Sequence, residues 1–506
     1  MAIAVNTNVP SLTAQRNLLN TQNKMGTALQ RLSSGLRINS AKDDAAGLAI
    51  TDRMTSQVRG LNQAVRNAND GISLAQTTEG ALQETTVLLQ RMRELAVQSA
   101  NDTNNSSDRA SLQDEINQLQ SEVNRIAETT QFNGKNLLDG TFGQAKFHVG
   151  AEANQVIQIG TGDARGTKLG SFQNYLTSEV ATYDASDNLT DGTNVDYQAG
   201  GGLAINGPKG SSIAAVKMQG SSAKDTSRQI NYVTGETGVT ATARTEAKIT
   251  GFQTEGSQNY KFNLSTGTGN GVTISASVID GDLNDLVDSI NDVSGSSGVV
   301  ATLNDAGNEI TLVDADGENI TIKRLDTDTS GWNFKTTHAN TNNTGTITGN
   351  FSGNAGSTGI ELRGAVLMES AKNFSVDNTG TVSGGGIVDI TEEAKDTFVS
   401  SLSSVDEIDI TTQFGANSAI SVVDKAISRV DQIRSNLGAI QNRFQSTISN
   451  LTNVSENISA SRSRILDADF AQETAELTKA QILQQAGLSM LSQANQLPQS
   501  ALSLLQ

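Results

Sequence analysis

The sequence predicts a multidomain α+β protein: mainly α at its paired termini, with long coiled-coil helices in a bundle, and a β-rich outer region inserted between them. Residues 1–130 and 411–506 repeat small and apolar side chains every three or four positions. The middle lacks this repeat and instead holds 36 of the 47 glycines and all five tyrosines. Because both ends share one helical pattern, we expect the termini to meet in one bundle.

The N-terminal part contains two apolar seams of about 3.5 residues per turn. After the polar break at residues 101–108 the second seam repeats the spacing of the first, so the two helices are predicted to form an antiparallel pair. The first seam comprises Met54, Val58, Leu61, Val65, Ala68, Ile72, Ala75, Leu82, Leu89, Met92 and Ala96, and the second Leu112, Ile116, Leu119, Val123 and Ile126.

A third seam, at residues 420–458, predicts a helix roughly 60 Å long. Three- and four-residue steps continue through it without a break. Such a stripe is most often the core of a helical bundle, and we interpret these three internal seams in that way.

The extreme termini have too few apolar residues for a core of their own. In residues 1–40 and 466–497 the stripe is thin and is interrupted by Asn, Gln, Ser and Thr, while every ordered residue loses backbone entropy. We therefore expect both ends to be weakly ordered in a lone molecule and to gain structure against other copies. The predicted polymerisation residues are Leu12, Leu29, Leu32, Leu36, Phe470, Leu477, Leu483, Met490 and Leu497.

Composition excludes several classes of protein. The net charge of −18 and pI near 4.6 argue against nucleic acid or an anionic membrane as partner. There is no run of 18 apolar residues, and the first residues lack the basic start and apolar centre of a signal peptide. The chain has no cysteine, which removes disulfides, thiolate metal sites and cysteine nucleophiles.

Catalytic and cofactor motifs are weak, and we expect no enzyme activity, cofactor or metal. The two histidines, His148 and His338, have no second ligand at helical spacing and are interpreted as strand residues at the surface or half-buried. Glycine runs at 200–202 and 384–386 lack the context of a phosphate-binding loop and predict turns. Residues 314–317 (DADG) are similar to a calcium loop, but the twelfth position is Leu325, so we expect a hairpin turn instead.

Within the middle, short alternating runs predict strands, for example at 272–278 and 299–303. Leu283, Leu286, Val287 and Ile290 lie on one face of a predicted helix between them. Residues 270–323 therefore predict a strand, helix, strand, strand unit.

Long motifs at both ends resemble bacterial flagellin. They are LSSGLRINSAKDDAAGLAI at 32–50, QRMRELAVQSAN at 90–101, TQFNGKNLL at 130–138, and the ending from RILDADF at 464–470 to QLPQSALSLLQ at 496–506. The resemblance implies the major subunit of the flagellar filament, exported unfolded through a type III channel without a cleaved signal. The implied partners are other copies, an export chaperone, and cap and hook-junction proteins. A hook–filament junction protein, which shares the terminal code, is the alternative.

The resemblance also implies three layers. Residues 1–43 with 460–506 would line the filament channel, 44–178 with 400–459 would form a helical tube, and 179–399 would form the outer insertion, as one or two subdomains. Gly35, with Ser40 capping a new helix and Asp43 and Asp44 behind it, fits the break between the first two layers; an ordinary loop is the alternative. Residues 147–159 would form a small hairpin beside the tube helices.

Finally, the resemblance implies recognition by host receptors. Arg91, Leu95 and Glu115 match positions used by Toll-like receptor recognition, with Met92 as a departure from the pattern. Leu502, Leu504 and Leu505 match leucines recognised by an NLR-family receptor, and Gln506 stands where many relatives end in arginine. The same residues could instead make contacts between protomers.

Overall fold

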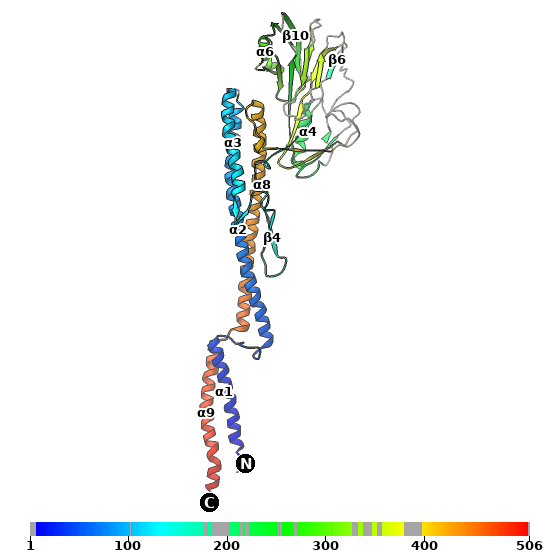
Figure 1. Ribbon diagram of the computed structural model, residues 1–506. Coiled ribbons are helices and arrows are strands. Elements are labelled where there is room, and N and C mark those ends of the chain that lie inside the picture. The colour runs from blue at the N-terminus through cyan, green and yellow to red at the C-terminus, as the bar shows by residue number, and fades with distance from the viewer. Residues whose placement is uncertain are drawn as a thin grey trace. The chain divides into compact units, whose positions relative to one another are not determined.

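The computed structural model describes residues 7–101, 103–176, 181–184, 202–212, 216–217, 222–250, 252, 256–267, 271–304, 306–325, 332–336, 347–351, 357–378 and 397–503. By its internal contacts the chain divides into two units (Figure 1). The first unit contains residues 1–78, 143–161 and 435–506, and the second contains 79–142 and 162–434. The long helices α2 (Ala45–Ser99) and α8 (Gln413–Leu466) contribute to both units. The predicted mainly α termini with a β-rich insertion are confirmed.

In the first unit, a small hairpin packs on the two long helices. Strands β3 (Gln144–His148) and β4 (Val156–Gly160) pair antiparallel, which confirms the predicted hairpin. The Phe147 ring meets the buried Phe444 ring edge-on at 5.9 Å. A side chain at Gly71 of α2 would come within 2.8 Å of that same ring, so the close approach requires glycine there. His148 is exposed at the end of β3, as predicted, whereas His338 lies outside the described residues.

The second unit begins with an antiparallel helix pair, as the seams predicted. Helix α3 (Ser106–Thr129) starts at a capping box in which Asn105 and Asp108 bond reciprocally. Residues 79–99 of α2 run alongside α3, and Arg91 on α2 forms an ion pair with Glu115 on α3. The seam residues Leu82, Leu89, Met92 and Ile116 are fully buried in this pair. The short strands β1 (Gln131–Phe132) and β2 (Lys135–Asn136) follow.

The β-rich region of the second unit contains three sheets among the described residues. At 270–323 the predicted order of a strand, a helix and further strands is confirmed, but the structure has a second, one-turn helix and three later strands where two were predicted. The eight-stranded sheet has the order β12-β13-β9-β18-β5-β21, with β15 and β16 paired beside β9; the five-stranded sheet is β11-β10-β14-β17-β6; and the four-stranded sheet is β20-β19-β7-β8. The element bounds are β5 (Gly170–Leu176), β6 (Ala181–Asp184), β7 (Gly202–Asn206), β8 (Val216–Lys217), α4 (Ala223–Tyr232), α5 (Thr234–Thr237), β9 (Thr240–Thr250), β10 (Ser257–Thr266), β11 (Val272–Ile279), α6 (Asn284–Asn291), α7 (Ser294–Ser297), β12 (Val300–Leu303), β13 (Ile310–Asp314), β14 (Ile320–Arg324), β15 (Trp332–Thr336), β16 (Ile347–Phe351), β17 (Ser357–Leu362), β18 (Ala365–Ser370), β19 (Ser375–Asn378), β20 (Thr397–Val399), β21 (Ser401–Ser404) and the 3₁₀ turn η1 (Val405–Glu407).

Two separate hydrophobic cores lie between these sheets and their helices. One is formed around α6, with Tyr260, Phe262, Ile290 and Leu312 among its buried members. The other is formed around α4, with Ile205, Ile230, Val239, Met368 and Phe374 among its members. Each helix therefore covers a core of its own.

The hairpin predicted at residues 314–317 is wrong. Strand β13 pairs with β12 and β9, whereas β14 pairs with β10 and β17 in a different sheet. The turn therefore carries the chain from one sheet to the other. The Asp314 side chain holds it by accepting the backbone N–H groups of Asp316 and Gly317 at 2.8 and 2.9 Å.

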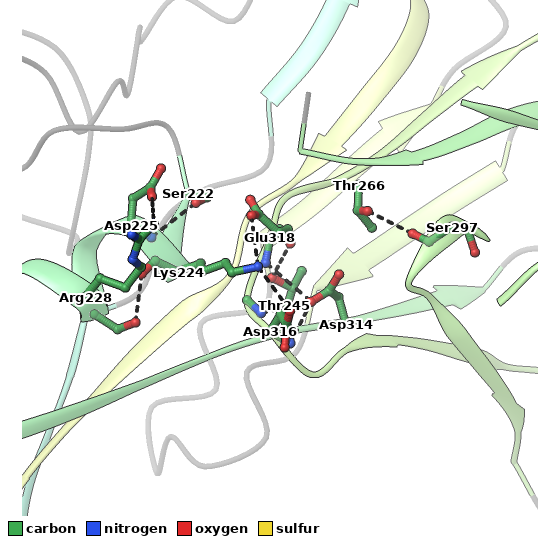
Figure 2. Close-up of polar contacts among 12 residues, drawn as sticks. Ser222, Lys224, Asp225, Arg228, Thr245, Thr266, Ser297, Asp314, Asp316 and Glu318 are labelled. Atoms are coloured by element: carbon green, nitrogen blue, oxygen red, sulfur yellow. Dashed lines mark hydrogen bonds and ion pairs between the residues drawn. The ribbon is translucent and has the colours of Figure 1, made fainter. Parts of the chain in front are cut away.

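A lysine from α4 occupies the acidic side of this turn (Figure 2). The Lys224 ammonium group lies 3.0 Å from Asp316 and 3.3 Å from Glu318. Among the described residues there is no group of three or more His, Asp or Glu side chains that could hold a metal ion. Of the two aspartates that gave the turn its similarity to a calcium loop, Asp316 is thus paired with a cation from the chain itself, and Asp314 binds the backbone of the turn.

The cap predicted at Ser40 is also wrong, although the break is confirmed. Helix α1 (Val9–Ser34) ends before Gly35, which adopts the left-handed conformation at φ 70°. Helix α2 starts at Ala45, and Asp44, whose side chain accepts the Gly47 N–H at 2.8 Å, is its cap. Ser40 instead donates its backbone N–H and its hydroxyl to Asp43. A hydrogen bond from the Asn39 N–H, together with those from Ser40, holds the pKa of Asp43 below its usual value.

Candidate functional site: the terminal helix pair

The first and last described helices, α1 (Val9–Ser34) and α9 (Phe470–Ser503), lie side by side as one antiparallel pair, the terminal helix pair (Figure 1). The Asn8 side chain caps α1 by accepting the Ser11 N–H, and Pro10 fits its first turn. A break of three residues separates α9 from α8, where Asp469 accepts the N–H groups of Ala471 and Gln472. The two termini therefore meet, as the shared helical pattern predicted.

Polar contacts at the two ends of the pair fix its register. The Ser11 hydroxyl donates to Asn495 at 2.8 Å, and Asn8 donates to the backbone carbonyl of Ala494. At the other end Arg31 forms an ion pair with Glu473 at 3.0 Å. A slip of either helix would separate both sets of partners, so polar groups specify the alignment.

Backbone bonds join the two connections that lead into the pair. Leu36 forms an isolated antiparallel bridge with Asp467. The Arg37 N–H donates to Leu466 at 2.7 Å, and the Ala468 N–H donates to Gly35 at 2.9 Å. The connection after α1 and the connection before α9 are thereby held together.

The side chains that the pair buries are small. On α1 only Ser11 and Ala28 are buried, and among the described side chains of α9, residues 470–496, only Ala480 and Ala494 are buried. The small Gly487 lies against Leu18 at a distance that leaves room for little more than a methyl group. The helices therefore approach closely through small residues, and several large apolar side chains stay exposed on their outer faces.

Most of the predicted polymerisation residues face solvent. Met490 is 61% exposed, and Leu12, Leu29, Phe470 and Leu483 are exposed to a similar degree. Leu32, Leu36 and Leu477 are half-buried, and the side chain of Leu497 is outside the described structure. Four further exposed apolar residues were not among the predicted polymerisation residues: Val9, Leu19, Ile482 and Leu488. Both helices thus present large apolar side chains that nothing in the described chain covers.

Three of the predicted receptor residues, Arg91, Leu95 and Glu115, belong to the second unit. Arg91 and Glu115 are half-exposed and bond to each other, and Glu94 also pairs with Arg91. These partners raise the pKa of Arg91, Glu94 contributing most. Leu95 is buried at 1% exposure, Leu502 lies in α9 with its side chain outside the description, and Leu504 and Leu505 are outside the described residues.

The second unit also contains a cavity of about 300 Å³ beside the first turns of α8. Its lining combines Arg244, Glu246 and Glu369 with the apolar groups of Tyr175, Leu367 and Phe414. Burial raises the pKa of Glu246 against the attraction of Arg244 and Lys248. Separately, no described helix is both long and apolar enough to cross a membrane.

Comparisons with known proteins agree with the terminal helices. The bacterial flagellin N-terminal helical region matches residues 5–143, the bacterial flagellin C-terminal helical region matches 420–505, and the flagellin hook IN motif matches 261–316. The chain is 42% identical to B-type flagellin of Pseudomonas aeruginosa over 510 residues and 38% identical to flagellin A of Vibrio cholerae over 506 residues. Each alignment covers 100% of both chains. A solved structure of FliC from Burkholderia pseudomallei matches 74% of this chain and 99% of its own at 20% identity, with a TM-score of 0.28.

The full-length relatives are flagellins, which confirms the filament subunit over the hook–filament junction protein. Flagellins are structural proteins of the extracellular flagellar filament. The chain therefore belongs to the bacterial flagellin family and is a structural subunit of the flagellar filament.

Proposed function

We propose that this subunit polymerises through the terminal helix pair. The observation that carries the proposal is the set of nine large apolar side chains exposed on α1 and α9: Val9, Leu12, Leu19, Leu29, Phe470, Ile482, Leu483, Leu488 and Met490. Burying each side chain against another copy would contribute about 1.5–3 kcal/mol. The contact is heterologous, so its repetition builds an open helical polymer.

The proposed layers follow from the same surface. Residues 1–43 with 460–506 would line the channel, because their exposed apolar groups need neighbours on several sides. Residues 44–178 with 400–459 would form the surrounding tube, and 179–399 the outer surface, since this insertion carries its own two cores. In this arrangement the insertion has no part in the polymer contacts.

Secretion and the further partners are also part of the proposal. The chain would leave the cell through the flagellar type III channel, held by an export chaperone beforehand and added beneath a cap above the hook-junction proteins. We propose a purely structural role without catalysis, because self-assembly requires only surfaces that bind each other.

Recognition by host receptors is a second proposed role. Arg91 and Glu115 offer a half-exposed charged surface on α2 and α3. Leu95 lies one turn from Arg91 and is buried, so its contribution would be to hold that helix surface in place. Leu502, Leu504 and Leu505 would supply the cytosolic receptor contact. Binding of the Toll-like receptor ectodomain to monomer, compared between wild type and Arg91→Ala, tests the first contact; unchanged affinity would contradict it.

Seeded elongation tests the main proposal. Purified monomer is added to short filament seeds and followed by light scattering and electron microscopy. Deleting residues 1–40 is expected to abolish elongation while the β signal in circular dichroism persists. Filaments of normal form from this deletion would sink the proposal.

Point variants give a matched control for the deletion. Leu483→Gln with Met490→Gln removes apolar groups from the exposed surface of α9 and is expected to slow elongation at least tenfold. Tyr232→Gln replaces a side chain that is 91% exposed, but on α4 in the second unit, and is expected to leave elongation unchanged. Equal slowing by both changes would mean that exposed apolar area in general, and not the terminal helix pair, drives growth.

A further inference from the structure

Two segments of the β-rich region repeat one sequence at an offset of 60 residues. Residues 223–242 and 283–302 agree at nine of their twenty positions, without a gap. The shared residues in the first segment are Asp225, Ile230, Asn231, Val233, Gly235, Gly238, Val239, Ala241 and Thr242. Only the second segment lies within the match to the flagellin hook IN motif.

The two segments also share the same arrangement of helix, one-turn helix and strand. Asn231 donates to the carbonyl of Ala241 at 2.7 Å and accepts its N–H at 2.8 Å. Asn291 makes the same two bonds with Ala301, at 2.9 and 2.8 Å. In both segments a one-turn helix ends at a left-handed glycine, Gly238 at φ 74° and Gly298 at φ 76°. Each asparagine thus ties its helix to the strand that follows.

The strands around the two segments pair in the same way. The hairpin β7·β8 before α4 corresponds to β10·β11 before α6. Around α4, strand β9 pairs with β18, and β19 pairs with β7. Around α6, β12 pairs with β13 and β14 pairs with β10 in the equivalent positions. All six pairings are antiparallel, and each set surrounds one of the two hydrophobic cores.

Chain order places one set inside the other. The strands β10 to β14 and helices α6 and α7 all lie between β9 and β18, which are neighbours in the other set. We propose that the β-rich region consists of two copies of one folding unit, with the second copy nested in the first, and that the copies have different roles. The first copy is the joint to α8, and the nested copy is a removable surface module. This inference does not depend on how the filament assembles.

The contacts to α8 distinguish the two copies. The buried carboxylate of Glu369, at 5% exposure, accepts the Ser421 hydroxyl, and Lys425 donates to Thr240 at 2.9 Å. The Arg244 guanidinium lies 5.4 Å from the centre of the Phe414 ring. These partners all belong to the first copy and to the first turns of α8.

The nested copy has different residues at the equivalent positions. In the first copy Ala241 pairs with Met368, and in the nested copy the equivalent Ala301 pairs with Leu312. By this register, Val313 of the nested copy stands at the position of Glu369, and Val300 stands at the position of Thr240. Asn304 stands at the position of Arg244. The nested copy therefore keeps the fold but has lost, or never acquired, the polar groups that hold the first copy to the helix.

A turn of the nested copy can be used to close the chain in an experiment that removes this copy. Its equivalent strands are joined by residues 304–309, where the Asn304 side chain accepts the N–H groups of Asn308 and Glu309 at 3.0 and 3.1 Å. In the shortened chain, this six-residue turn replaces residues 244–365 and connects Ala243 to Val366. These two residues pair with each other in the first copy, as Leu303 and Ile310 do in the nested copy, so the register of the strands is kept. Strand β6 loses its partner β17 and is expected to exchange freely.

Hydrogen exchange of the shortened chain tests the proposal. Amides at 203–206, 223–241 and 366–376 are expected to keep their protection to within about threefold of the full chain. Loss of protection in these segments would overturn the removable-module assignment, because the first copy would then need the nested one.

A matched pair of point variants in the full chain gives a second test. Asn291→Ala is expected to raise exchange about tenfold or more at 257–322 and to leave 203–206 and 366–376 unchanged, since it removes two bonds from the nested copy alone. Asn231→Ala should raise exchange in the first copy. Equal loss of protection in both copies from Asn291→Ala would show a single cooperative unit and overturn the proposal.

Discussion

The terminal helix pair and the β-rich region use their large apolar side chains in opposite ways. Met490 and Leu19 face solvent on α9 and α1, and the pair itself buries only small residues such as Ala28 and Ala480. In the β-rich region Phe262 and Tyr260 are almost fully buried. A segment that covers its own apolar groups is complete in one molecule, whereas one that exposes them needs neighbours. The difference supports the proposal that the ends of the chain assemble with other copies, while the middle folds on its own.

The largest expected effect separates stability from assembly. Phe262→Ala removes a buried ring and is expected to lower the free energy of unfolding of the β-rich region by about 3–5 kcal/mol. Calorimetry of monomer measures this loss. Seeded elongation at a temperature where the variant is folded should proceed at the wild-type rate; a parallel loss of elongation would break the comparison.

A pair of glycine variants tests the packing of the long helix α2. Gly71→Ala places a methyl group within 2.8 Å of the Phe444 ring and is expected to destabilise the first unit by about 1–3 kcal/mol. Gly80→Ala on the same helix meets nothing within 4 Å and is expected to stabilise it by up to about 1 kcal/mol. Thermal unfolding followed at 222 nm measures both. Shifts of the same sign would show that α2 is not packed as described.

A smaller effect is expected from the register contacts. Glu473→Gln removes the charge that pairs with the half-exposed Arg31 and is expected to weaken the terminal helix pair by roughly 0.2–1 kcal/mol. The critical concentration for elongation should rise by no more than a few-fold, and this rise should shrink at high salt. A salt-independent loss of all elongation would assign Glu473 a direct contact between copies.

The smallest expected effect is a dependence of the stability of the β-rich region on pH. Burial raises the pKa of Glu246 in the folded chain above its unfolded value, so the folded state binds this proton more tightly. The carboxylate therefore lowers stability at neutral pH, and this cost disappears as the pH falls through the folded pKa. Glu246→Gln should be more stable than wild type at pH 7, with a difference that narrows in acid. Parallel stability curves for the two proteins would contradict this assignment.

Local patterns in the sequence were sufficient to predict the long helices. The seam through Leu82, Leu89 and Met92 is buried as predicted, because a helix in a bundle shows its core face as a regular repeat. The hairpin at Phe147 was equally predictable, since both of its strands lie within one short stretch.

Partners distant along the chain could not be predicted in this way. The turn at Asp314 has hairpin residues, but its flanking strands find partners in different sheets, and local turn chemistry does not specify a distant partner. The first copy of the repeated unit was not predicted, because its neighbouring strands β9 and β18 are separated along the chain by the nested copy. Ser40 and Asp44 are both good caps four residues apart, and only the start of α2 decides between them.

The central claim is that the ends of the chain gain their stability from other copies. Hydrogen exchange of amides at residues 7–34 and 470–496, measured in monomer and in filament, tests it most directly. We expect fast exchange in monomer and slow exchange in filament, while amides of the β-rich cores exchange equally in both states. Equal protection of the terminal helix pair in monomer and filament would contradict the claim.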